Sequence, residues 1–187
     1  MKKILVSIVV IIFASVYLPL KAQTQKVDDC DFFDSVVNNH NQLFQSSCIP
    51  STVEMVLKYC KVVSPDFYDL QQDWKNKIDG SFLNFDKTEL YGVTFFHQFD
   101  LPRNADFPID SLFQTIEKEL KAGRKVIISL PSDMGWHMFV VHKQTADGEF
   151  VSYSKQASHT LILRNTKEIV RKVNGTDIMT YSVRKKD

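Results

Sequence analysis

The sequence predicts an α+β fold in which a helical half packs against an antiparallel β-sheet. Segments with the helical spacing of apolar residues dominate the first half of the 187-residue chain, and strand-like runs dominate the second. These runs are short and are separated by turn signals at Asp147-Gly148 and Asn174-Gly175. Helices followed by strands, in place of a regular alternation, indicate two segregated layers. A cleft between such layers would set a helix-borne side chain opposite a strand-borne one.

The first well-marked helix is expected from about Cys48 to Val62. Its apolar residues recur at i, i+3, i+4 and i+7 and therefore form one buried stripe. Pro50 fits the first turn, where a missing N–H costs nothing. The stripe consists of Val53, Val56, Leu57 and Cys60.

Capping and turn residues mark the other elements. Ser64-Pro65-Asp66 predicts the cap of a second helix that runs to about residue 77 and ends at Asp79-Gly80. Asp110 is expected to cap the next helix. The other helical expectations are a short helix or turn over residues 32–44 and helices over 111–122 and 166–172. Strands are expected over residues 92–99, 125–130, 136–143, 150–154, 160–164 and 178–184.

Composition favours one folded domain over residues 23–187. The chain is 44% hydrophobic and 12% aromatic, enough to bury a sizeable core. It carries 23 Lys and Arg residues against 22 Asp and Glu residues. Because the charges balance, no nucleic-acid partner is indicated.

Residues 1–22 are expected to be a signal peptide for export to the periplasm or the cell exterior. Lys2 and Lys3 give a positive start, an apolar run follows from Ile4 to Leu20, and Ala22 is a small residue at a plausible cleavage point. The alternative is an uncleaved membrane anchor, since 17 residues are close to a spanning length. A membrane contact is expected only in that case.

Export bears on the three cysteines, Cys30, Cys48 and Cys60, because an oxidising compartment permits disulfides. An odd count leaves at least one thiol without a partner in the chain, and Cys48 is the candidate. Cys30 and Cys60 then either pair with each other or are both buried as small apolar residues.

Cys48 is the candidate nucleophile because it stands where a helix begins. The unpaired N–H groups and partial positive charge of a helix N-terminus stabilise a thiolate and lower the pKa of a cysteine. Gln42, six residues upstream, would supply a side-chain amide that donates to the negative oxygen of a tetrahedral intermediate, together with the N–H of Cys48.

His137 is the candidate base for this thiol. It follows Gly135-Trp136 at the start of an expected strand, some 90 residues after Cys48. Side chains alternate along a strand, so His137 and His142 face opposite ways and cannot share one site. His142 is therefore interpreted as a structural or surface residue, and His159 as a surface residue.

These segments together resemble the papain-like cysteine peptidases, and within them the leader peptidases of bacteriocin exporters and their stand-alone bacterial relatives. Gln42, then Ser47-Cys48-Ile49-Pro50-Ser51 and Leu57-Lys58-Tyr59, is similar to their nucleophile segment. Residues 135–141 are similar to their histidine strand. The resemblance spans about residues 38 to 155. It implies a papain-like fold with Cys48 as nucleophile, His137 as general base and acid, and Gln42 in the oxyanion hole.

The chain departs from this family at two places. Ile49 follows the cysteine where relatives have glycine, and Ser154 falls where relatives place the Asp or Asn that orients the histidine. A serine can accept a hydrogen bond from the imidazole, but it cannot stabilise an imidazolium by charge, and loss of that charge can reduce the rate by orders of magnitude.

Three functions follow as expectations. The first is a secreted cysteine peptidase that cleaves a peptide or protein substrate with Cys48, His137, Gln42 and Ser154, without a metal or organic cofactor. The second is a catalytically weak or inactive papain-like domain that binds a peptide or partner protein. The third keeps the first chemical steps but acts as a transamidase or amidase on cell-wall peptides.

Overall fold

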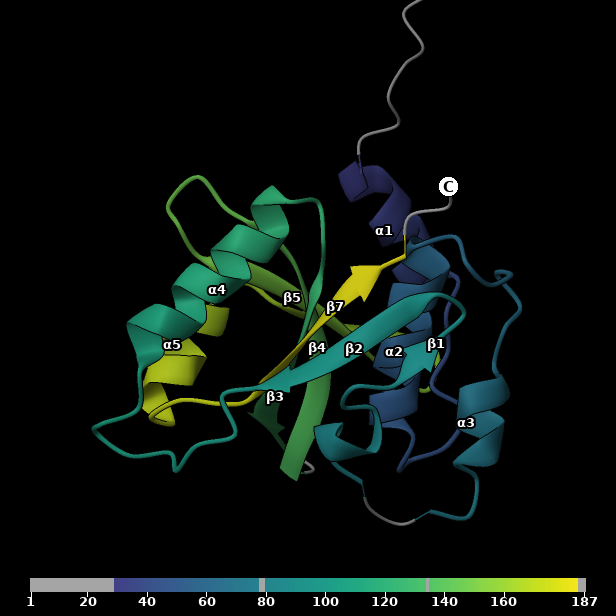
Figure 1. Cartoon of the computed structure of the whole chain (residues 1–187), viewed down its shortest axis with the longest axis horizontal. Coiled ribbons are helices and arrows are strands. Elements are labelled where there is room, and N and C mark those ends of the chain that lie inside the picture. The colour runs from purple at the N-terminus through teal and green to yellow at the C-terminus, as the bar shows by residue number, and fades with distance from the viewer. Residues whose placement is uncertain (1–28, 78–79, 134, 185–187) are drawn as a thin grey trace, which may run out of the picture.

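The computed structural model describes residues 29–77, 80–133 and 135–184. The expected signal peptide over residues 1–22 and the turn residue Asp79 lie outside these ranges. Within them the chain forms five α-helices, one 3-10 helix and a seven-stranded antiparallel sheet (Figure 1). The α+β class that the sequence predicts is therefore confirmed.

The sheet has the strand order β1-β2-β7-β3-β4-β5-β6. Strands β3 to β6 follow one another as antiparallel neighbours, whereas the last strand, β7, inserts between β2 and β3. Through β7, the C-terminal part of the chain pairs with strands β2 and β3 from its middle. The strands are β1 (Glu89–Leu90), β2 (Val93–Gln98), β3 (Val126–Ser132), β4 (Gly135–Gln144), β5 (Phe150–Gln156), β6 (His159–Leu163) and β7 (Ile178–Val183).

Helices cover both faces of the sheet (Figure 1). One face carries α1 and α2, with α3 and the 3-10 helix beside them, and the other carries α4 and α5. The sequence predicted a single helical layer, because nothing in its periodicity shows which face a helix covers. The helices are α1 (Asp29–Asn38), α2 (Cys48–Tyr59), α3 (Asp69–Asp73), η1 (Phe82–Asn84), α4 (Ile109–Lys121) and α5 (Thr166–Lys172).

Two apolar clusters hold these layers together, and β4 contributes to both. Met138 and Val140 pack with the cluster under α1 and α2. Phe139 and Val141 pack with the cluster under α4. The alternation expected for this strand is therefore confirmed, and it decides on which side of the sheet each histidine lies.

Four helices differ in their boundaries from the prediction. The first, expected as a short helix or turn over residues 32–44, is α1 over Asp29–Asn38. The second helix, expected from Ser64 to about residue 77, is only α3, and the N–H of Gln71 in its first turn donates to the carboxylate of Glu54 at 3.0 Å. Helix α2 ends at Tyr59, and Lys61 has a left-handed φ of 57° that no helix continues through. Asp110 lies inside the first turn of α4, whose N-cap is Pro108, so it complements the helix dipole without capping.

Candidate active site

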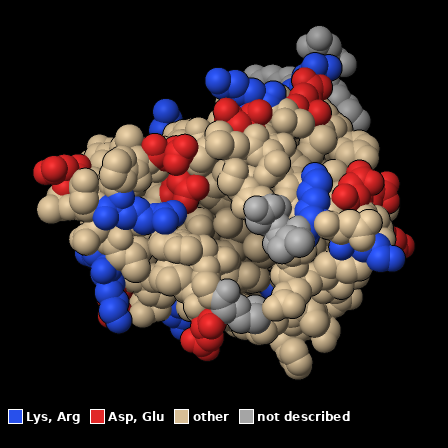
Figure 2. Space-filling model, turned by 90° about the horizontal axis from the view of Figure 1, so that it is seen from below, with Lys and Arg blue, Asp and Glu red and all other residues tan. Residues whose placement is uncertain are grey.

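A cavity of about 810 Å³ opens where the start of α2 meets the hairpin between β3 and β4. Figure 2 shows the face that carries it, hollowed near its centre and mostly uncharged there. Cys48 and His137 both line this cavity. Apolar walls come from Phe44, Ile49, Trp136 and Met138. The cysteine and the histidine that the sequence singled out therefore line the same cavity.

Cys48 is the first residue of α2, as the sequence predicted. Burial raises the pKa of its thiol above the ordinary value of 9.0, and the nearby backbone N–H groups of Met138, Ile49 and Cys48 itself partly offset this increase. The sequence predicted a lowered pKa from the helix N-terminus alone. That expectation was wrong in sign, because the sequence does not show how far the sulfur is removed from water.

Two contacts of its Nε2 atom orient the ring of His137. This nitrogen lies 2.8 Å from the hydroxyl oxygen of Ser154 and 3.2 Å from the carbonyl oxygen of Lys155. The Ser154 hydroxyl donates its own proton to the carbonyl of Met138 at 2.5 Å, so it must accept from the ring. Nε2 therefore carries the proton, and Nδ1 is the nitrogen with a lone pair. Burial lowers the pKa of His137 below 6.5, which favours this neutral ring at pH 7.

The thiol and the imidazole do not hydrogen-bond to each other in this structure, although they share the cavity. The raised pKa of Cys48 and the lowered pKa of His137 have the same consequence. At neutral pH the pair consists of an uncharged thiol and an uncharged ring. The structure therefore holds no preformed thiolate–imidazolium pair.

Gln42 lies outside the lining of the cavity. It is buried, and its Nε2 group donates to the carbonyls of Phe44 at 2.9 Å and Gln45 at 3.0 Å. Its Oε1 atom is buried and has no hydrogen-bond partner. In this conformation Gln42 shapes the loop before α2, and the structure does not bring its amide to the sulfur.

The other described histidines have structural surroundings. His142 is buried on the opposite side of β4 from His137 and stacks on Phe33 with ring centroids 5.1 Å apart, which confirms its structural interpretation. His159 is exposed on β6, as expected. His97 contacts Asp177 at 3.0 Å between β2 and the approach to β7.

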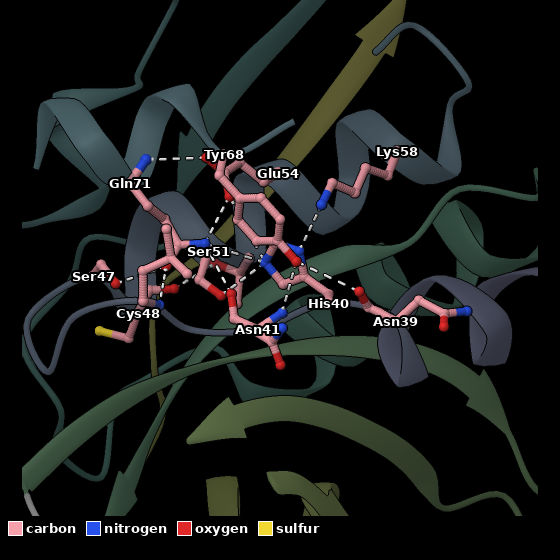
Figure 3. Close-up of polar contacts among 12 residues, drawn as sticks. Asn39, His40, Asn41, Ser47, Cys48, Ser51, Glu54, Lys58, Tyr68 and Gln71 are labelled. Atoms are coloured by element: carbon pink, nitrogen blue, oxygen red, sulfur yellow. Dashed lines mark hydrogen bonds and ion pairs between the residues drawn. The ribbon is translucent and has the colours of Figure 1, made fainter. Parts of the chain in front are cut away.

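A buried polar network behind Cys48 was missed from the sequence (Figure 3). His40, Glu54 and Gln71 are fully buried, and Lys58 nearly so. Lys58 Nζ lies 2.9 Å from Nδ1 of His40, and the other ring nitrogen lies 3.1 Å from the Ser51 hydroxyl. Residues 49–58 of α2 are buried on all sides, so an acid there must find partners. In the sequence, the acidic Glu54 within this apolar helix was the one indication of a buried polar network.

Burial controls protonation in this network. It lowers the pKa of His40 to about 3, an effect that the nearby charge of Lys58 adds to, and the ring stays neutral. It also raises the pKa of Glu54 to about 7 and lowers that of Lys58 to about 8. The sulfur of Cys48 points away from these groups (Figure 3).

Other expectations concern thiols, metals and membranes. Cys60 is a free cysteine, which excludes a bond to Cys30 in this structure; the side chain of Cys30 lies outside the described part. Among the described residues no three His, Cys, Asp or Glu side chains are grouped to hold a metal ion. None of the helices in the described ranges has the length and apolar character needed to cross a bilayer.

The chain was compared with protein-family models, curated proteins and solved structures, and none of these matches it.

Proposed function

We propose that this chain is an exported cysteine peptidase with a papain-like arrangement, which hydrolyses peptide bonds through an acyl-enzyme on Cys48. One observation carries the proposal. Cys48, at the start of α2, shares a cavity with a histidine whose Nε2 is held by Ser154 and the carbonyl of Lys155. A nucleophile, a base and a group that orients the base are the minimum of covalent acyl transfer.

The reaction would begin as the Cys48 thiol gives its proton to Nδ1 of His137. The sulfur attacks the carbonyl carbon of the peptide bond, and the imidazolium then protonates the leaving amine. A water molecule attacks the resulting thioester and passes its proton to Nδ1. The carboxylic acid product leaves, and the thiol is restored.

The tetrahedral intermediates carry a negative oxygen that needs donors. The N–H of Cys48 at the start of α2 is the first candidate, and such donors each contribute roughly 3–4 kcal/mol. Gln42 is the second, and this role requires its side chain to rotate away from the carbonyls of Phe44 and Gln45. In the free protein the Gln42 amide would donate to the loop carbonyls, and in the tetrahedral intermediate it would donate to the negative oxygen. Its hydrogen bond would then stabilise the intermediate and not the bound substrate.

The second candidate function is a papain-like domain that binds peptides without cleaving them. Ser154 favours it, because His137 has only a hydroxyl and a carbonyl to stabilise its charged form. The raised pKa of Cys48 favours it as well. A transamidase or amidase would share the steps above, so only the substrate distinguishes that activity.

Incubating the purified protein with a peptide library distinguishes the peptidase from the peptide-binding domain. A peptidase cleaves members of the library, and Cys48→Ala abolishes cleavage without lowering the unfolding temperature by more than a few degrees. If the wild-type protein retains peptides but cleaves neither them nor cell-wall amides, the binding domain is the correct function.

The pH dependence of the thiol is a second expected result. Because the pKa of Cys48 is raised, the thiolate fraction increases as pH rises toward and beyond 9, and each unit below the pKa costs about tenfold. The rate of alkylation of Cys48 by iodoacetamide, mapped by mass spectrometry from pH 5 to 10.5, should therefore climb with no plateau between pH 6 and 8. Cys60 is the internal control, since burial raises its pKa to about 11. A plateau near neutrality would show a preformed thiolate and contradict the neutral pair.

A further inference from the structure

A turn that follows α3 places two lysines on the wall of the Cys48 cavity. Lys75 and Lys77 line this cavity, and both are exposed. The turn is held by the N–H of Lys77, which donates to the carbonyl of Trp74 at 2.9 Å, and by the carbonyl of Lys77, which accepts from the Ser46 hydroxyl at 2.6 Å. The turn that carries both lysines is therefore tied to the loop that leads to Cys48.

The indole of Trp74 gives the Lys77 ammonium a defined place. Trp74 is only 4% exposed and stacks on Phe85, with ring centroids 5.7 Å apart. Lys77 Nζ lies 4.0 Å from the centroid of the Trp74 ring, a cation–π contact. Because an aromatic ring has no net charge, this contact orders the ammonium without neutralising it.

The charge on the cavity wall has one sign. No Asp or Glu among the described residues lines the cavity, and neither lysine forms an ion pair with a described residue. The chain as a whole carries 23 Lys and Arg residues against 22 Asp and Glu residues, so this excess is local. A cleft with charges of one sign and apolar walls concentrates ligands of the opposite sign. The other polar lining residues have hydroxyl or amide groups: Gln45, Ser46, Asn76 and Ser132.

We propose that Lys75 and Lys77 form a subsite that binds a carboxylate of the substrate peptide. The carboxylate is that of an Asp or Glu side chain or of a free C-terminus, since both present the same group to an ammonium. The inference rests on the proposed peptidase function, which supplies the substrate, but the binding preference can be measured without cleavage. Because one short turn carries both lysines, the preference falls on one side of the scissile bond.

A charge scan of the best peptide from the library tests the subsite. Glu, Gln and Lys are placed in turn at each position beside the scissile bond, with the C-terminus amidated. We expect kcat/KM to be about tenfold higher for Glu than for Gln at one or two adjacent positions on one side, and lower for Lys than for Gln. Short neutral peptides with a free or an amidated C-terminus test the second source of the carboxylate. A wild-type protein without a preference in either series would overturn the proposal.

Lys75→Gln/Lys77→Gln removes both charges and keeps polar side chains of similar length. The Glu-to-Gln ratio should fall below about twofold, while kcat/KM for the Gln peptide stays within about twofold of wild type. Lys121→Gln/Lys172→Gln is the matched control, since it removes two exposed charges from α4 and α5 on the other face of the sheet (Figure 1). It should keep the wild-type ratio. A cavity variant that retains the full preference would overturn the proposal.

Should the cavity variant not fold, the salt dependence of the wild-type ratio still decides. Between about 0.05 M and about 0.5 M NaCl the ratio should fall severalfold, because the Debye length shrinks to about 4 Å. A ratio that salt does not change would show that charge does not cause the preference, and the proposal would fail.

Binding of the same peptides, fluorescently labelled, to Cys48→Ala separates this inference from the peptidase function. The dissociation constant should be lower for the Glu peptide than for the Gln peptide by about the same tenfold. If the wild-type protein cleaves no peptide but Cys48→Ala shows this preference, the subsite is supported and the peptidase function is wrong. If the wild-type protein cleaves all peptides equally, the peptidase function remains and the subsite is wrong.

Discussion

His137→Ala is expected to lower the rate of peptide hydrolysis on the order of a thousandfold, because no other histidine and no Asp or Glu among the described residues lines the cavity to take the Cys48 proton. His142 cannot replace it, since it is buried on the other side of β4 against Phe33. The loss should appear in kcat, with KM little changed, because the imidazole acts in the transition state more than in substrate binding.

The measurement is steady-state hydrolysis of the best peptide from the library. His159→Ala is the matched control, since His159 is exposed on β6 and outside the cavity. It should retain wild-type kinetics. A His137→Ala enzyme within tenfold of the wild-type kcat would remove His137 from the mechanism.

Gly175→Ala is expected to destabilise the fold by roughly 3–5 kcal/mol, the largest effect of any small substitution we foresee. Gly175 has a φ of 106° in the turn between α5 and β7. A Cβ atom there would overlap the ring of Phe107, which is buried in the cluster under α4. The substitution therefore combines backbone strain with a clash that the core cannot absorb by moving a flexible end.

Gly123→Ala is the control that measures backbone strain without a side-chain clash. Gly123 has a φ of 76° after α4, but a Cβ added to it meets no atom within 4 Å. Its cost should be about 1–2 kcal/mol, the strain of a left-handed residue without a clash. Urea unfolding of both variants gives the difference directly. Equal costs would mean that Phe107 is free to move and that the packing described for α4 is looser than we infer.

Much of the frame around the cavity could be predicted from residue patterns. A helix N-terminus near Cys48 follows from Pro50 and the apolar stripe after it, and α2 begins there. The side of β4 on which His137 lies follows from the two-residue period of a strand. The Asn174-Gly175 turn follows from its two residues, both of which have positive φ. Each of these three features depends on residues that are close together in the sequence, so a short segment is enough to predict it.

What could not be predicted depends on contacts between distant segments. Helix α3 begins only at Asp69, and in its first turn the N–H of Gln71 donates to Glu54, seventeen positions earlier. The pKa of Cys48 is raised because several elements exclude water from it. The amide of Gln42 turns into its own loop, where two carbonyls accept from it. None of these partners is marked by spacing or residue type.

The central claim is that Cys48 and His137 exchange a proton across the cavity, and competitive alkylation tests it most directly. Wild-type protein and His137→Ala are treated with iodoacetamide at pH 8, and the rates at Cys48 and Cys60 are measured by peptide mapping. We predict that Cys48 reacts at least about tenfold faster than Cys60 in the wild-type protein. His137→Ala should slow Cys48 and so reduce this preference, because the base that accepts the thiol proton is lost, whereas the rate at Cys60 stays unchanged. Equal slow labelling of both thiols in the wild-type protein, or an unchanged preference in His137→Ala, would contradict the claim.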